Sequence, residues 1–165
     1  MENKKIYFKE KQIFYISLIP ALIIIGILSV FYFLEIGNED KKITLIPYLF
    51  GVSVFIFIIL ASYNLKILIN NNYIYLSFGI GIIKKKISVK NIDTNKIEVI
   101  NIPWYYGIGM RFSNIGTIFN TKQGKGIRIK MKSNEKSFII VSKRIEEIKE
   151  TILKINREST YGNTV

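Results

Sequence analysis

The chain has 165 residues, a formal net charge of +12 and 49% hydrophobic residues; this length allows one modest domain plus an anchor but not two full soluble domains. It contains neither Cys nor His, which excludes thiol nucleophiles, disulfides, thiolate and imidazole metal ligands, and the usual proton-shuttling side chain. We therefore expect no metal, no cofactor and no catalytic residues.

The first predicted elements are two long uncharged stretches that follow a basic flank over residues 1–12. As a helix, the stretch 13–34 would be about 33 Å long, which matches a hydrocarbon core of about 30 Å. The stretch 43–63 has nearly the same length, and only the polar turn 35–42 separates the two. This pattern predicts an antiparallel transmembrane hairpin.

Flanking lysines predict the orientation of the hairpin. Lys4, Lys5, Lys9 and Lys11 precede the first stretch, whereas the turn holds two Lys beside three acidic residues. Since Lys and Arg accumulate on the cytoplasmic side, we expect a protein of the cell (plasma) membrane with both termini in the cytoplasm. A secretory signal is the alternative for residues 13–34, but the apolar run is too long for one and has no Ala-x-Ala-like cleavage site.

From Leu65 onward the pattern changes to short alternating runs broken by Asn, Gly and Lys, which is typical of antiparallel strands. The first two runs are separated by consecutive Asn residues and the last two by Ser, Asn and Glu, so each pair is predicted to form a hairpin. The predicted strands are Leu65–Asn70, Tyr73–Phe78, Ile82–Val89, Lys96–Ile102, Ile127–Lys132 and Lys136–Val141.

The segment 121–126 superficially suggests a phosphate-binding loop because it combines Lys with Gly124 and Gly126. It lacks the Gly-x-x-x-x-Gly-Lys-Ser/Thr spacing and stands between strands instead of opening a helix. We interpret it as a hairpin turn in which the two glycines are structural.

The pattern changes again near the C-terminus, where four isoleucines recur at helical spacing in a segment rich in Glu and Lys. They are Ile145, Ile148, Ile152 and Ile155. This spacing predicts one amphipathic helix with Ser142 as its N-cap, followed by a frayed polar tail over residues 157–165.

Three segments together carry a resemblance to a known family: 73–79, 82–92 and 103–111. Combined with the terminal helix, they make residues 65–156 resemble the bacterial pleckstrin-homology-like (PH-like) proteins, small membrane proteins in which a transmembrane hairpin precedes such a domain. The resemblance implies a membrane α-helical hairpin plus an α+β domain, namely a PH-like, partly open antiparallel β-barrel or sandwich capped by a C-terminal helix. It implies no common reaction and no single ligand.

The segment 103–111 is one candidate binding site, because exposed aromatic patches mark interaction surfaces. Its candidate binding residues are Trp104, Tyr105, Tyr106 and Arg111, with Gly107 and Gly109 as turn residues. The structural alternative is that the aromatic residues pack into the barrel or lie at the bilayer interface, and that Arg111 pairs locally.

Two basic runs form a second candidate site. They are Lys84, Lys85 and Lys86, and the alternating Arg128, Lys130 and Lys132. Together they would make a basic face attracted to an anionic lipid surface. The alternative is a solvated strand face, and nucleic-acid binding is not expected because no recognised module is present.

Asp93 and Glu98 are the only acidic residues between Asn64 and Ser133, and no pattern brings them into one cleft, so an enzyme is not expected. The leading hypothesis is a non-enzymatic membrane protein that presents its basic domain at the cytoplasmic membrane face to a protein, peptide or lipid surface. Two alternatives are an immunity protein against a membrane-active bacteriocin and an accessory subunit of a larger membrane complex.

Overall fold

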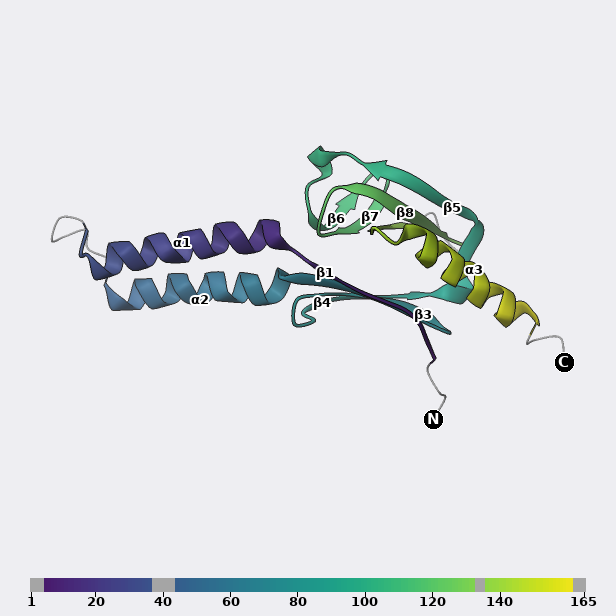
Figure 1. Cartoon of the computed structure of the whole chain (residues 1–165), viewed down its shortest axis with the longest axis horizontal. Coiled ribbons are helices and arrows are strands. Elements are labelled where there is room, and N and C mark those ends of the chain that lie inside the picture. The colour runs from purple at the N-terminus through teal and green to yellow at the C-terminus, as the bar shows by residue number, and fades with distance from the viewer. Residues whose placement is uncertain (1–4, 37–43, 133–135, 162–165) are drawn as a thin grey trace.

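The computed structural model of the chain describes residues 5–36, 44–132 and 136–161. Within these residues it has an α+β fold with two β-sheets and three α-helices. Two of the helices lie side by side and extend away from the sheets, and the third lies beside the sheets at the other end of the molecule (Figure 1). Residues 37–42 of the predicted turn 35–42, the predicted turn 133–135 and the tail residues 162–165 lie outside the described residues.

The two long apolar stretches form helices α1 (Tyr15–Phe33) and α2 (Leu45–Ser62), as predicted. The rings of Tyr32 and Tyr48 stack across the pair with centroids 4.4 Å apart, and the hydroxyl groups of Ser29 and Tyr48 lie 3.2 Å apart. Helix α2 is long and apolar enough to cross a membrane, whereas α1 contributes a shorter apolar helix over Leu18–Phe33.

The first sheet has the order β1-β2-β3-β4, with all neighbours antiparallel. Its strands are β1 (Ile6–Ile13), β2 (Asn64–Asn70), β3 (Tyr73–Phe78) and β4 (Ile83–Ser88). The predicted hairpin of β2 and β3 is confirmed, and Asn70 Oδ1 accepts hydrogen bonds from the backbone N–H groups of Asn72 and Tyr73 in its turn. Strand β1 was not predicted: most of the supposed N-terminal flank is an edge strand, so α1 and α2 stand between two adjacent strands of one sheet.

The second sheet has the order β5-β8-β9-β7-β6. Its strands are β5 (Ile92–Ile102), β6 (Gly109–Ser113), β7 (Gly116–Asn120), β8 (Gly124–Met131) and β9 (Ser137–Val141), and short 3-10 turns η2 (Val89–Asn91) and η3 (Trp104–Tyr106) precede β5 and β6. The predicted pairing of β8 with β9 is confirmed.

Two expectations about this sheet are wrong. Residues 121–126 do not form a hairpin turn, because β9 lies between β7 and β8. The strands are not all antiparallel either, since β7 and β9 are parallel. Geometry explains the second point: the chain reverses direction between β7 and β8 and again between β8 and β9, so β9 must run in the same direction as β7.

The two sheets pack face to face and do not close into one barrel. Leu65, Ile67 and Ile74 from the first sheet share a buried core with Ile127 and Ile129 from the second. Helix α3 (Ile145–Tyr161) covers this core with Ile145, Ile148, Ile152 and Ile155, the four isoleucines predicted to face inward. Burial of this apolar surface is the main source of the domain's stability.

Helix α3 is longer than predicted. Ser142 Oγ accepts a hydrogen bond from the backbone N–H of Arg144 just before the helix begins, which agrees with a capping role near this end. At the other end the helix continues through Tyr161, whereas a frayed tail was predicted from Arg157. The hydroxyl of Tyr7 on β1 donates a hydrogen bond of 2.8 Å to Glu158, which ties the last turns to the first sheet and raises the pKa of Tyr7.

Polar side chains of β1 connect the first sheet to the second. Gln12 Nε2 donates to the backbone carbonyl of Val141 at 2.9 Å, and Thr121 Oγ1 donates to Gln12 Oε1 at 2.8 Å. Ser142 Oγ donates to Glu10 at 2.6 Å. Since Gln12 lies three residues before α1, these bonds fix the Thr121 end of the second sheet close to the base of the helix pair.

Candidate functional site

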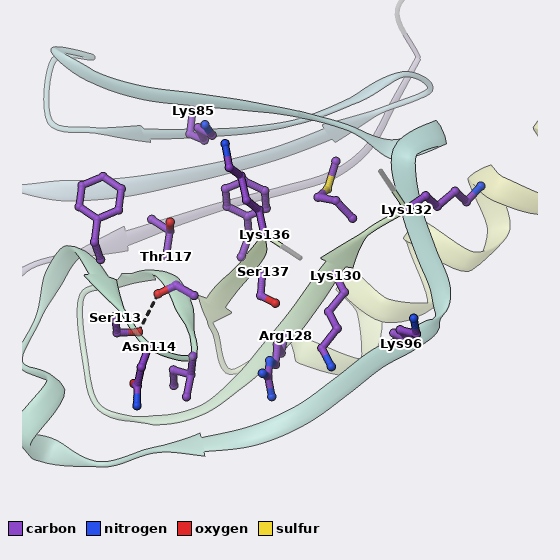
Figure 2. A pocket seen from close by; sticks show the side chains of 15 residues that line it. Lys85, Lys96, Ser113, Asn114, Thr117, Arg128, Lys130, Lys132, Lys136 and Ser137 are labelled. Atoms are coloured by element: carbon purple, nitrogen blue, oxygen red, sulfur yellow. Dashed lines mark hydrogen bonds between the residues drawn. The ribbon is translucent and has the colours of Figure 1, made fainter. Parts of the chain in front are cut away.

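A groove of about 1120 Å³ is lined by residues of both sheets and is rich in basic side chains. Figure 2 shows Lys85 on one side of it and Ser113, Asn114, Arg128 and Lys130 on the other. Both edge strands on this side contribute, since Lys85 stands on β4 and Phe112 and Ser113 stand on β6. Its basic lining residues are Lys85, Lys96, Arg128, Lys130, Lys132 and Lys136.

The positive charge of this groove is only partly compensated. None of the described residues that line it is acidic. Glu98 lies 3.3 Å from Arg128 and 3.7 Å from Lys130, and Asp93 lies 3.4 Å from Lys96. Among the described residues, the five cations Lys85, Lys96, Arg128, Lys130 and Lys132 stand against these two carboxylates, which favours a positive potential in a concave surface, where field lines are focused.

Apolar side chains form part of the same lining. The ring of Phe138 lies under the ammonium group of Lys85, with Nζ 5.2 Å from the ring centroid. Phe112 is 81% exposed, which is unusual for a large apolar side chain. A groove with cationic side chains and exposed aromatic surface can hold an anionic ligand that also carries apolar groups.

Arg128 contributes a further unsatisfied donor. Its Nε is buried and has no hydrogen-bond partner among the described residues, although its Nη1 contacts Glu98. A buried N–H without an acceptor costs about 1–3 kcal/mol relative to a paired one.

The structure divides the predicted basic residues between different surfaces. Along β4, Lys85 faces the groove while Lys84 and Lys86 face away from it, because successive side chains of a strand point to opposite faces. Lys86 Nζ lies 3.6 Å from the ring centroid of Tyr73 on that other face. Arg128, Lys130 and Lys132 all line the groove, and Lys132 also donates to the backbone carbonyl of Lys90 at 3.0 Å.

The aromatic segment 103–111 is a separate surface and does not line the groove. Tyr106 packs against a small buried cluster formed by Ile102, Ile118, Ile139 and Val141, and its hydroxyl donates to Asn114 at 3.0 Å. Trp104 and Tyr105 are 73% and 67% exposed. Arg111 is exposed, and its guanidinium packs against Gly107.

Three of the four predicted turn glycines have a backbone that requires glycine, with φ values of +69° at Gly107, +110° at Gly109 and +127° at Gly124. Gly126 has a different role. It lies within β8, where a Cβ atom would come 3.1 Å from Ile139 and 3.2 Å from the Ile140 carbonyl, so it serves close packing and not a turn.

Sequence reasoning missed Lys96, Lys136 and the two phenylalanines of the groove. Lys96 and Lys136 stand on or beside strands that are 40 residues apart, and they approach only because β8 pairs with both β5 and β9. The one local signal was the alternation of basic and apolar residues in β8, which places Arg128 and Lys130 on one face.

No protein-family model, curated protein or solved structure matches the chain.

Proposed function

We propose that this chain is a non-enzymatic integral membrane protein whose α1–α2 hairpin holds a basic PH-like domain at the cytoplasmic membrane face, where the groove binds an acidic segment of another protein. The PH-like interpretation is supported by two packed sheets with one C-terminal helix over their core. The observation that carries the binding role is the groove, where the described residues include five cations, without counting Lys136, and two bordering carboxylates.

The membrane anchor is supported by the exposure of apolar side chains on α2. No residue of α2 is buried, although Phe50, Phe57 and Ile46 are large and apolar. Such a surface is stable in hydrocarbon and unstable in water. Strand pairing between β1 and β2 brings both ends of the hairpin to the same side, and Lys9, Lys11 and Lys66 flank the helices there, which favours the cytoplasm.

A protein ligand is favoured over the lipid headgroups of the same membrane because of where the groove lies. Pairing of Ile102 with Gly124 and of Ile92 with Met131 shows that the groove residues of β8 stand toward the end of the second sheet that is remote from Thr121 and the helix pair. Gly124 and Lys130 are separated by about 20 Å of strand. This separation exceeds the Debye length of about 8 Å at physiological salt, so attraction by the membrane surface is largely screened at the groove.

The test compares two double variants of the full chain in nanodiscs of neutral lipid. Lys85→Glu/Lys130→Glu reverses two charges in the groove, and Lys84→Glu/Lys86→Glu makes the same change in net charge on the opposite face of the first sheet. The probe is a fluorescein-labelled peptide of alternating Glu and Phe, followed by fluorescence anisotropy. The wild-type chain should bind it, and the groove variant should lose at least about tenfold in affinity, since each close charge pair contributes on the order of 1 kcal/mol.

The control variant should bind within about twofold of the wild type once salt is near physiological. Equal weakening in both variants would mean that net charge alone attracts the peptide, and no weakening in the groove variant would mean that the groove is not the site. Either result would overturn the proposed binding role.

A further inference from the structure

We infer that the domain touches the bilayer directly through four exposed side chains, Ile80 and Ile82 in the β3–β4 turn and Trp104 and Tyr105 in η3, here called the membrane-facing rim. The inference rests on the proposed function in one respect, namely that α2 spans the membrane. It adds a second contact with lipid, separate from the helix pair and from the groove, which would hold the domain at a fixed angle to the membrane.

Hydrogen bonds fix the position of the β3–β4 turn relative to the end of α2. Ile80 N–H donates to the backbone carbonyl of Leu60 at 2.9 Å, and Gly79 N–H donates to the carbonyl of Asn64 at 2.8 Å. Gly79 has φ +53°, and a Cβ atom there would come within 2.1 Å of the Leu60 carbonyl oxygen, so only glycine allows this approach. When α2 spans the membrane, Ile80 therefore lies at the level of its last turn.

Ile80 and Ile82 are large apolar side chains that remain more than half exposed. They are 59% and 51% exposed, although they stand beside a helix end whose neighbours are apolar. Tyr15 and Tyr63 mark the same level at the ends of α1 and α2, where aromatic residues with one polar edge gather at membrane–water interfaces. Lipid at that level would cover the two isoleucines.

The η3 segment is held at the same end of the domain by a second set of contacts. Thr121 bonds to Gln12, three residues before α1. Its neighbour Asn120 is fully buried; its Nδ2 donates to the Gly107 carbonyl at 3.0 Å and its Oδ1 accepts from Gly109 N–H at 2.9 Å. In Figure 1 the connection from β5 to β6 accordingly lies at the end of the second sheet nearest the helix pair.

The exposure of Trp104 and Tyr105 is imposed by a rigid support. Asn120 fixes the backbone after η3, Tyr106 is anchored in the cluster around Ile118, and Tyr105 packs on Tyr106 with ring centroids 4.9 Å apart. The exposed rings of Trp104 and Tyr105 lie next to each other, with centroids 6.4 Å apart. Aromatic side chains with a polar edge are suited to the headgroup region, where the ring lies among acyl chains and the polar group is hydrated.

Trp104 is the only tryptophan in the chain, so its fluorescence reports on the rim without a label. The experiment uses the full chain in vesicles of neutral lipid, with and without lipid that carries a doxyl quencher near the headgroup. Trp104 should lose about half of its emission to the shallow quencher and should be shielded from aqueous iodide, as an interfacial tryptophan would be. Free access of iodide with no quenching by doxyl lipid would contradict the rim.

Two variants make the result specific to position. In Trp104→Phe/Ile82→Trp the probe moves to the other half of the rim, and the same quenching is expected. In Trp104→Phe/Phe112→Trp it moves to an equally exposed site in the groove, where iodide should quench and doxyl lipid should not. Equal lipid quenching at position 112 would mean that the domain lies flat on the membrane, and shielding of Trp104 without lipid quenching would mean that protein covers it; both results overturn the rim.

Extraction with alkaline carbonate in parallel separates this inference from the proposed function. If the chain stays in the vesicles while Trp104 remains unquenched, the membrane anchor is supported and the membrane-facing rim is contradicted. A chain that is released by carbonate has no spanning anchor, and both proposals then fail.

Discussion

Helices α2 and α3 are nearly the same length and both rely on isoleucine, yet they expose opposite surfaces. In α2 no residue is buried, and its 18 residues include no charged side chain. In α3 the isoleucines at 145, 148, 152 and 155 are buried against the two sheets, while Glu, Lys and Arg occupy the other face. In α2 only uncharged residues stand between the apolar side chains, whereas in α3 charged residues separate the isoleucines.

This difference indicates which surroundings, protein, water or lipid, each helix requires. An apolar stripe at three- and four-residue spacing needs protein on one side and water on the other. A helix that is apolar all round needs an apolar environment all round, and α1 covers only one line of α2, around Tyr48 and Gly51. Under the proposed function, lipid covers the remainder. The same substitution should therefore have different consequences in the two helices.

The largest expected effect separates the two helices by stability. Ile152 is fully buried, so Ile152→Ala should lower the free energy of unfolding of the domain by about 2–5 kcal/mol through lost burial and the cavity left behind. The matched change Ile56→Ala, at a side chain that is 47% exposed, should leave it within about 0.5 kcal/mol. Hydrogen exchange of the β2 and β8 amides in detergent measures both; similar losses would mean that α2 belongs to the folded core.

A charged side chain should be tolerated on α3 but should oppose membrane insertion when placed in α2. Ile56→Lys should oppose membrane insertion by about 3 kcal/mol, because an ammonium group near the middle of a spanning helix must be dehydrated or drawn toward the interface. Lys154 on α3 is already an exposed charge and is harmless there. The fraction of chain retained after carbonate extraction is the measurement, with Ile56→Leu as control. Full retention of the Lys variant, at the level of the Leu variant, would argue against a spanning α2.

The contrast between local and distant signals also explains how much of the molecule the sequence predicts. Both long helices, the β2–β3 and β8–β9 hairpins and the inward face of α3 follow from patterns within a single segment. Strand β1 was missed because its inward residues Glu10 and Gln12 are polar and bond to the second sheet, which removes the apolar alternation of a half-buried strand.

The candidate site was predictable only in part for the same reason. Alternation within β8 placed Arg128 and Lys130 together, but it could not show that Lys85 joins them while its neighbours Lys84 and Lys86 face elsewhere. That division depends on which face of β4 packs on the second sheet. The exposure of Trp104 and the burial of Tyr106, two residues later, likewise depend on the cluster around Ile118 from a distant strand.

The smallest expected effect concerns the charged end of α3, which has no counterpart in α2. Arg144 Nε donates to Glu147 at 2.7 Å in the first turn, and this hydrogen bond holds the pKa of Glu147 below its usual value. A carboxyl group whose pKa is depressed in the folded state stabilises the fold above its unfolded pKa, and this contribution is lost as pH falls through the folded pKa. Between pH 6 and pH 3 the wild-type domain should therefore lose slightly more thermal stability than Glu147→Gln, because only the wild type has this bond to lose. The control is Glu150→Gln, which removes an acidic residue one turn further on and so reports the general loss of negative charge. Thermal unfolding at the two pH values measures the difference. An identical pH dependence in the wild type and Glu147→Gln would show that the exposed Arg144–Glu147 pair contributes nothing to the start of the helix.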